Sequence, residues 1–259
     1  MKVLRLKLYQ PQAHYRIPFT YIRRHTYPIP PYSTVIGMLC NALGIRNPKG
    51  EGEPEDENFK ELKRIKLSIA GKFAAKTTEK IWFRNLSEKQ HNNRFGSATN
   101  RSISGLVEHP GGQAPVSIDI LNDVRLLIYV HHQDVGFLKT LEEALRSPER
   151  WISTLHLGRA EDWVVIEDIS IVSLSDGEEP VRGYPDWFFY VPEEKAPGVG
   201  LVYRLPTFYR LVDGVRTFDF VRVYLVSSGF AGEVKTRFDS KANMPVFLTT
   251  LTEGGKDET

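Results

Sequence analysis

The sequence predicts an α+β fold: a ferredoxin-like βαββαβ unit with a long β-hairpin insertion and additional C-terminal β-strands. Two observations predict it. The periodic patterns follow the order strand, helix, strand, long insert, strand, helix and strand, which is the order of a split βαβ arrangement. In addition, residues 76–120 carry few core signals and interrupt this unit between its second and third strands. Such a stretch is typical of a projecting segment rather than a second core.

The first strand is expected at residues 2–9, where leucines alternate with basic residues at a period of two. The proline- and tyrosine-rich residues 10–32 follow and are expected to be irregular. Ser33 or Thr34 is then expected to cap a helix that runs to about Leu43. Gly44 supplies a natural end to this helix, and Gly37 within it is expected to allow close packing.

The second half of the unit has equally clear signals. Residues 46–58 read as a polar loop, and Asp134 can cap a helix whose apolar residues recur at helical spacing up to Leu145. Further strands are predicted at residues 65–75, 124–131, 163–174, 187–191, 201–210 and 217–226. We therefore expect a ferredoxin-like domain over 1–75 and 121–175, an insertion over 76–120, and a C-terminal β extension over 176–259.

Composition excludes several classes of protein. The 259 residues are 41% hydrophobic and 25% charged, which is typical of a globular domain and not of a disordered or fibrous one. The sequence has no signal-peptide pattern and no apolar run of membrane-spanning length, so a cytoplasmic protein without membrane contact is expected. With one cysteine, Cys40, expected to be buried and inert, and with no phosphate-binding, dinucleotide-binding or metal-ligand spacing, neither a cofactor nor a metal is expected.

The charge is unevenly distributed along the chain. Residues 1–50 hold eight lysines and arginines and no acidic residue, and residues 62–107 hold ten basic and two acidic residues. Residues 51–61 hold six acidic residues and one lysine, and residues 108–259 hold fifteen basic and twenty-four acidic residues, so the net charge of the whole chain is only +2. In residues 14–27 and 72–101 the cations are mixed with aromatic and small residues. This mixture favours a single-stranded nucleic acid, whose phosphates need cations and whose bases need rings.

The segment RRHTYPIPPYSTVIGMLCNALGI at 23–45 resembles the Cas-five family of CRISPR-associated proteins. The resemblance begins in the first strand, VLRLKLYQPQAHYR, and includes LGRAEDWVVIEDI at 157–169. The family belongs to the RAMP superfamily of RNA-binding proteins, whose ferredoxin-like fold is of the RRM type. Among its subtypes the sequence looks most like type I-B.

The resemblance implies a non-catalytic subunit of the Cascade interference complex, which acts in antiviral defence. In this family the RAMP fold and a β-hairpin thumb grip the 5′ handle of the CRISPR RNA (crRNA). The subunit caps the filament of Cas-seven backbone subunits beside the large subunit, which is of the Cas-eight type, and meets target DNA through the complex. The insertion at 76–120 matches the thumb by its location.

Residues of three kinds are candidates for binding the RNA: cations for phosphates, rings for bases, and hydroxyls at a helix N-terminus. Before the first helix they are Arg16, Tyr21, Arg23, Arg24, His25, Tyr27, Ser33 and Thr34. On the insertion they are Lys76, Lys80, Arg84, Lys89, Arg94, Phe95 and Arg101. Arg159 is a further candidate, for which a salt bridge with Glu161 or Asp162 is an equal possibility.

Two alternative functions remain open. A type I-C subgroup of the family is a metal-independent endoribonuclease that processes precursor crRNA, and such chemistry needs a general base. His91, with Lys89 nearby, is the best candidate for that base, and His25 beside Tyr27 is a weaker one. The second alternative is a protein-only assembly module whose basic half binds an acidic partner.

Overall fold

A computed structural model of the chain gives the arrangement of these elements. It describes residues 1–18, 20, 22–46, 55–84, 92–93, 96, 102–103, 106–107, 113–181, 183–195, 198–212, 215–227, 229–230 and 234–252. None of the helices in these ranges is long and apolar enough to cross a membrane.

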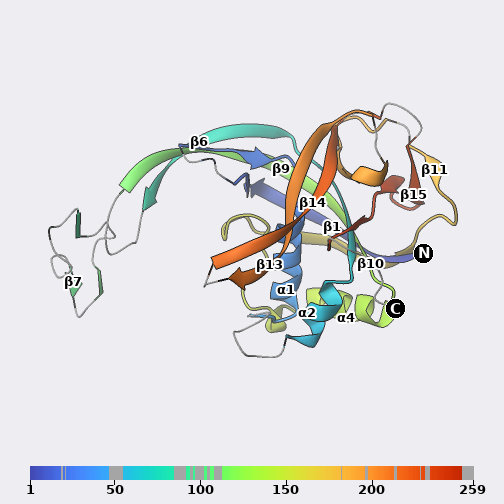
Figure 1. Cartoon of the computed structure of the whole chain (residues 1–259), viewed down its shortest axis with the longest axis horizontal. Coiled ribbons are helices and arrows are strands. Elements are labelled where there is room, and N and C mark those ends of the chain that lie inside the picture. Colours follow the sequence, from blue (N-terminus) through green and yellow to red (C-terminus); the bar gives the residue numbers. More distant parts are fainter. Residues whose placement is uncertain are drawn as a thin grey trace.

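The ferredoxin-like unit is present and its strands follow the expected order. Its elements are β1 (Lys2–Ala13), α1 (Tyr32–Ala42), β5 (Lys66–Lys72), β9 (Gln113–His131), α4 (Val135–Arg146) and β10 (Val165–Ser173). The strands lie in the order β10-β1-β9-β5 and every neighbouring pair is antiparallel. Both helices lie on one side of this sheet, together with the short α2 (Glu57–Leu62) (Figure 1). The α+β class and the antiparallel split βαβ order are thus confirmed.

The sheet continues beyond β5 through the C-terminal part of the chain. The added strands are β12 (Phe188–Pro192), β14 (Val215–Ser227) and β13 (Leu201–Val212), with the short strands β17 (Thr249–Thr250) and β3 (Arg23–Arg24) beside β5 and β9. A separate small sheet contains β11 (Glu179–Pro180), β15 (Lys235–Asp239) and β16 (Met244–Val246). The remaining short elements are β2 (Tyr15–Arg16), β4 (Thr26–Tyr27), β7 (Ser102–Ile103), β8 (Leu106–Val107), η1 (Pro148–Arg150) and η2 (Glu193–Lys195).

A long two-stranded ribbon forms most of the described part of the insertion. The strand β6 (Ala75–Arg84) pairs with the first half of β9, from Ala75 opposite Asn122 to Arg84 opposite Gln113. The second half of β9 lies in the ferredoxin-like sheet, so one continuous strand joins the ribbon to the body. The ribbon arches away from the body (Figure 1). The division of the chain at residues 75, 120 and 175 stays a prediction.

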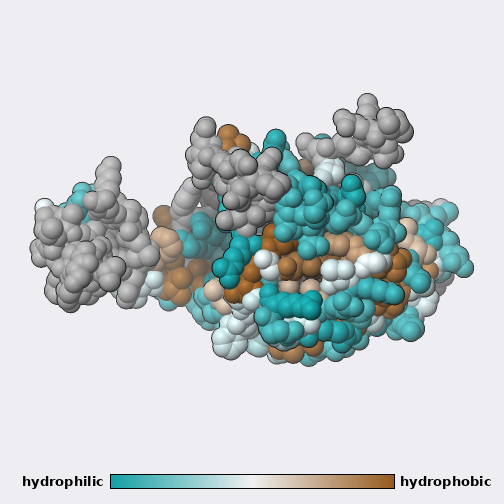
Figure 2. Space-filling model, turned by 90° about the horizontal axis from the view of Figure 1, so that it is seen from below, coloured by the Kyte–Doolittle hydropathy of each residue, from teal (hydrophilic) through white to brown (hydrophobic). Residues whose placement is uncertain are grey.

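Strand alternation builds a core on each face of the sheet. On β1, Leu4, Leu6 and Leu8 are buried against the helices, whereas Val3 is buried on the opposite face with Phe189. The surface seen from below is mostly hydrophilic, with an apolar band across its middle (Figure 2). Both faces of the central strands therefore bury side chains. The helices cover one face, and the C-terminal segment covers part of the other.

The start of α1 differs from the prediction, whereas its end agrees. The N-cap residue is Pro31, and no side chain caps the helix, so the expectation that Ser33 or Thr34 caps it was wrong. The fixed φ and missing N–H of proline suit the residue at a helix start, which moves both hydroxyls into the first turn. At the other end, Gly44 has φ +76° and donates to Asn41, while Ile45 donates to Cys40 over 2.9 Å. These two bonds form a Schellman motif.

The polar loop predicted at 46–58 ends earlier than expected, because α2 begins at Glu57. The Asp56 side chain accepts from the N–H of Phe59, and Phe59 is buried with Leu62. Six residues with two apolar positions are too short for a clear helical period, which is why the sequence signal was missed. The predicted cap of α4 is confirmed, since Asp134 accepts from Gly136 over 2.7 Å.

Two glycines give a paired test of the packing. A Cβ atom on Gly71 in β5 would lie 2.6 Å from Leu126 Cδ2 and 2.7 Å from Ile29 Cγ2. At Gly37 a Cβ atom would meet nothing within 4 Å, so the expectation that Gly37 allows close packing was wrong. We expect Gly71→Ala to lower the free energy of unfolding by about 1–3 kcal/mol through overpacking.

The control variant Gly37→Ala is expected to leave stability unchanged or to raise it by up to about 1 kcal/mol, because alanine favours a helix. Urea unfolding curves of the two variants and the wild type measure both effects. Equal midpoints for the two variants would contradict the assigned packing of β5.

Candidate nucleic-acid interface

A buried carboxylate organises the junction between the ribbon and the loop that precedes α1. Asp119 of β9 is 1% exposed. Its Oδ1 accepts from Arg23 Nη2 over 3.1 Å and from Thr78 over 3.0 Å, and its Oδ2 lies 3.0 Å from His25 Nδ1. Burial alone would raise the pKa of Asp119, but hydrogen bonds from His25, Thr78 and Arg23 outweigh burial and hold that pKa below its usual value. The ionised carboxylate therefore fixes the loop to β9.

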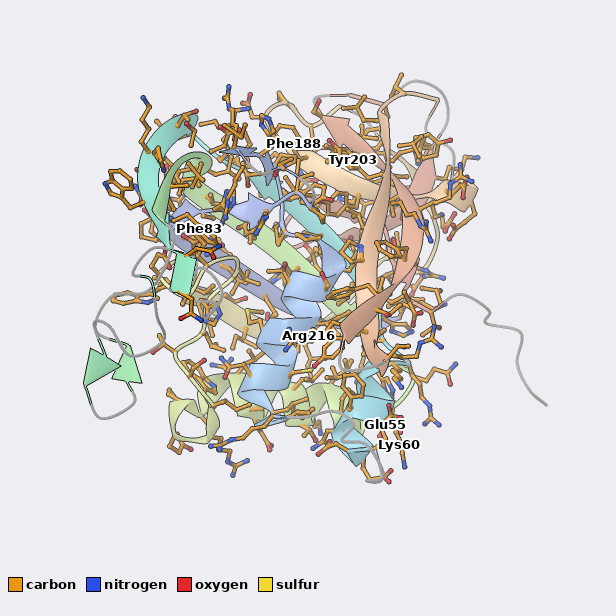
Figure 3. The ribbon with its side chains drawn as sticks, turned by 60° about the vertical axis from the view of Figure 1, so that its left-hand side comes forward. Glu55, Lys60, Phe83, Phe188, Tyr203 and Arg216 are labelled. Atoms are coloured by element: carbon orange, nitrogen blue, oxygen red, sulfur yellow. The ribbon has the colours of Figure 1, made fainter. Side chains whose placement is uncertain are left out.

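Successive side chains of β3 point to opposite faces, and this separates the neighbouring Arg23 and Arg24. β3 runs parallel to β9, with Arg23 opposite Ser117 and Arg24 opposite Ile118. Arg23 is held on the side of Asp119, whereas the guanidinium of Arg24 lies 4.1 Å from the ring centre of Phe83, on the other face of the ribbon. Figure 3 locates Phe83 on the ribbon. Of these two adjacent arginines, only Arg24 is thus directed to the concave side of the arched ribbon.

That concave side contains a cavity of about 650 Å³, which we call the arginine cavity. Five candidate residues from the N-terminal segment line it: Arg16, Arg24, Tyr27, Ser33 and Thr34. Ile81 and Ile118 of the ribbon form another part of its wall, and Pro206, Phe218 and Phe220 of the β13–β14 hairpin complete it. The cavity therefore joins cations from the N-terminal segment to rings from the C-terminal extension.

The charge in the arginine cavity is poorly compensated. The Nε atom of Arg24 is buried without a hydrogen-bond partner. Burial, together with the nearby Arg16, lowers the pKa of Arg24. Two arginines that repel each other, one with an unpartnered donor, gain most from an anion placed between them.

A second buried carboxylate holds the loop on the far side of the cavity. Asp162, 1% exposed, accepts from Arg159 Nη2 over 2.7 Å and from the N–H groups of His14 and Arg159. Arg159 also pairs with Glu161 over 3.2 Å. The salt bridge named as the alternative for Arg159 is thus present, although Arg159 still lines the cavity.

Gly158 and His14 complete this wall. Gly158 has φ +105°, and a Cβ atom there would lie 2.7 Å from the carbonyl oxygen of His14, so a side chain is excluded. His14 Nδ1 donates to the Asp119 carbonyl over 2.8 Å, which leaves its Nε2 unprotonated, buried and without a partner. Burial is the main cause of the lowered pKa of His14. A neutral histidine therefore lies beside the arginines without adding charge.

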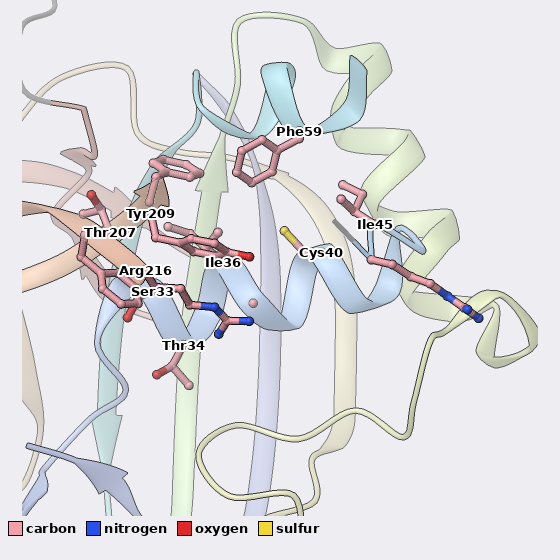
Figure 4. A pocket seen from close by; sticks show the side chains of 13 residues that line it. Ser33, Thr34, Ile36, Cys40, Ile45, Phe59, Thr207, Tyr209 and Arg216 are labelled. Atoms are coloured by element: carbon pink, nitrogen blue, oxygen red, sulfur yellow. The ribbon is translucent and has the colours of Figure 1, made fainter. Parts of the chain in front are cut away.

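The helix-start candidates and Tyr27 contribute in different ways. Tyr27 is 4% exposed and packs edge-on against Tyr203 with ring centres 5.5 Å apart, so it is mainly a core residue. Ser33 and Thr34 line the cavity and also a smaller cleft of about 260 Å³ between α1, α2 and the β13–β14 hairpin (Figure 4). Cys40 lines that cleft, and burial raises the pKa of its thiol to about 12, as expected for an inert cysteine.

The candidates on the insertion do not join the cavity where they are described. Lys76 lies opposite Leu121 and Lys80 opposite Ser117, which places both on the ribbon face that carries Arg23 and Thr78. Arg84 ends β6, but its side chain lies outside the described residues. The other candidates outside them are Tyr21, Lys89, Arg94, Phe95 and Arg101, as is His91. His25, the weaker candidate for a base, is held by Asp119 and does not line the cavity.

Sequence reasoning missed the residues that organise this site. Asp119 interrupts the apolar alternation of β9 (VSIDIL), and a lone acid in such a run was a usable signal of a buried carboxylate. Phe218 and Phe220 alternate on β14 but carry no local sign of the cavity they face. In the part of the chain that the structure describes, no three His, Cys, Asp or Glu side chains gather as a metal site would need.

The role of Asp119 gives a test by pH. We expect Asp119→Asn to lower the free energy of unfolding by about 1–3 kcal/mol at neutral pH, because Arg23 and His25 lose their charged acceptor. The pKa of Asp119 is lower in the folded protein than in the unfolded chain, where it is near 4. The resulting stabilisation is complete above the unfolded-state pKa and is lost as the pH falls through the folded-state pKa. The gap between the wild type and the variant should therefore close below about pH 4.

Denaturant unfolding at pH 7, 5, 4 and 3 measures this gap, and Asp123→Asn is the control. Asp123 lies on the same strand and is 49% exposed. A gap that is absent at pH 7, or that persists unchanged at pH 3, would contradict the assigned role of Asp119.

Residues 3–224 match the family described as CRISPR-associated protein (Cas_Cas5). No curated protein matches. The solved structures similar to the chain include three whose matches cover most of both chains. A subunit of a CRISPR RNA-guided surveillance complex has 15% identity and a TM-score of 0.57, covering 89% of this chain and 94% of its own.

The other two structures are more distant. A structure described as a Cas protein has 13% identity and a TM-score of 0.45, covering 94% and 98%. A CRISPR protein from Archaeoglobus fulgidus has 15% identity and a TM-score of 0.41, covering 92% and 96%. The first structure supports the fold, and the family assignment rests on the sequence match, which spans most of the chain. The chain belongs to the Cas-five family of CRISPR-associated proteins.

Proposed function

We propose that the protein is a non-catalytic crRNA-binding subunit of a type I Cascade complex and that it holds the 5′ handle of the crRNA in the arginine cavity. Support comes from the family assignment and from the cavity that joins Arg16 and Arg24 to the rings of the β13–β14 hairpin. The observation that carries the proposal is that Arg16 and Arg24 line one cavity, where burial and the charge of Arg16 disfavour the Arg24 cation and an RNA phosphate would offset both.

The cavity suits a kinked single strand better than a duplex. It is a local hollow bounded by the ribbon, the start of α1 and a hairpin, and its walls mix apolar rings with arginines. Single-stranded RNA is recognised in this way, with phosphates on cations and unstacked bases against rings or apolar walls. Ser33 and Thr34 place the first turn of α1 at the cavity, where backbone N–H groups add favourable charge for a phosphate.

The remaining candidates take roles outside the cavity in this proposal. Arg23 and His25 position the loop through Asp119, and Lys76 and Lys80 offer charge on the opposite face of the ribbon. The partners proposed with the handle are the Cas-seven backbone subunit and a Cas-eight-type large subunit, with target DNA met through the complex. Assignment to type I-B and location in the cytoplasm belong to the same proposal.

The RNA-binding role is tested with Arg16→Gln and Arg24→Gln together. We expect weaker binding of a handle-length RNA and a slope of log K against log salt reduced by about 1.4, which is about 0.7 for each lost phosphate contact. Filter binding at four salt concentrations measures both quantities.

The control is Arg150→Gln with Arg222→Gln, which removes two exposed arginines that do not line the arginine cavity and leaves the same net charge. Equal affinity and equal salt slope for the two double variants would remove the support for the cavity as the RNA site.

The endoribonuclease alternative has a direct test as well. The histidine that lines the arginine cavity, His14, has its Nε2 buried and so is poorly placed to reach a 2′-hydroxyl. We expect repeat RNA to remain intact when it is incubated with the purified protein in EDTA and analysed on a denaturing gel. Site-specific cleavage that leaves a 5′-hydroxyl product would instead establish the protein as a processing nuclease.

A further inference from the structure

The face of the central sheet that points away from the helices is only partly covered. The segment that contains β15 and β16 packs on it at one end, where Tyr129 donates to Asp239 over 3.2 Å. Next to this contact a hollow of about 560 Å³ remains, which we call the sheet-face hollow. Its wall includes Arg5, Lys7, Lys72, Arg125, Trp187 and Lys241. It shares no lining residue with the arginine cavity.

Cations and rings adjoin one another across three strands of this face. The register places Tyr9 of β1 opposite Arg125 of β9, and Arg125 opposite Lys72 of β5. The guanidinium of Arg125 lies 5.2 Å from the ring centre of Tyr9, and Lys72 Nζ lies 5.4 Å from that of Trp187. These contacts hold each ring next to a positive charge.

Carboxylates nearby neutralise only part of this charge. Glu167 pairs with Lys7 over 3.2 Å and with Arg125 over 3.3 Å, and Asp123 lies 3.7 Å from Arg125. Arg5 is paired with both Asp168 and Asp239. Lys72 and Lys241, by contrast, have no ion pair within the described part of the chain. These two lysines therefore keep their charge for a ligand.

The position of the hollow in the fold indicates the class of ligand. In the RRM, which is built on a four-stranded sheet, aromatic side chains of the sheet stack on the bases of single-stranded RNA. Here the central strands are β1 and β9, which carry Tyr9 and Arg125 on that face. An acidic peptide would use the lysines but would leave the two aromatic rings without a role.

We propose that the sheet-face hollow is a second binding site for a single-stranded polynucleotide. Lys72 and Lys241 contact its phosphates, and Trp187, with Tyr9 across the sheet, receives its bases. This site lies apart from the arginine cavity and goes beyond the binding of the handle.

The charge of the site is tested in the full-length protein by fluorescence anisotropy with labelled twelve-nucleotide oligouridine and oligothymidine. The variant is Lys72→Gln with Lys241→Gln, and the control is Lys2→Gln with Lys139→Gln, two exposed lysines outside the hollow. We expect the salt slope of the first double variant to fall by about 1.4 and that of the control to stay at the wild-type value. The two oligonucleotides distinguish RNA from DNA as the source of the strand.

The rings are tested separately. Trp187→Ala is expected to weaken binding about 5- to 100-fold, as for the loss of one stacked base, whereas Trp187→Phe keeps a ring and most of the affinity. Thermal melting of both variants checks that they fold. Equal salt slopes for the two lysine double variants, or equal affinity for the alanine and phenylalanine variants, would overturn the proposal.

Two further measurements separate this proposal from the others. If the two sites are independent, the loss of salt slope caused by Lys72→Gln with Lys241→Gln is the same in the wild type and in the Arg16→Gln, Arg24→Gln background. The proposal for each site can therefore be contradicted without affecting the other. Labelled oligoglutamate that binds with dependence on Lys72 and Lys241, when the oligonucleotides show none, would overturn the polynucleotide in favour of an acidic protein segment.

Discussion

The ionised carboxylate of Asp119 is the constraint on which the rest of the site depends. A charge buried to 99% is tolerated only when donors surround it, and Arg23, His25 and Thr78 supply them. Two of these donors come from the loop before α1 and one from β6. One buried charge therefore ties an otherwise irregular loop to the base of the ribbon.

The position of Arg24 follows from that attachment. Once Arg23 is held on the side of Asp119, the extended backbone of β3 must direct its neighbour to the other face. There Arg24 meets Phe83 and the arginine cavity. Asp162 plays the matching role across the cavity, where it binds the backbone of His14 and both the backbone and the guanidinium of Arg159. Two parts of the cavity wall are thus held in place by buried carboxylates, and Arg16 and Arg24 line the space between them.

One sheet contributes to both groups of cations. β9 runs through both the ribbon and the body, so it contributes to the cavity wall at Ile118 and to the sheet-face hollow at Arg125. On β1, the leucines that face the helices build the core that holds α1 in place, and the intervening Arg5, Lys7 and Tyr9 point to the opposite side. One sheet therefore contributes residues to two cationic surfaces.

The sequence by itself determined the order of strands and helices, the Asp134 cap, the Gly44 helix end and the enrichment of cations before α1. Each depends on residues within a few positions of one another, where period, capping and backbone preference act locally. Tertiary structure alone decided which cations share the arginine cavity, that Arg23 and His25 serve Asp119, and that Phe218 and Phe220 close the wall. The pairing of β3 with β9 and the return of β14 join residues about a hundred positions apart or more, and no local pattern encodes which strand edge a distant segment meets.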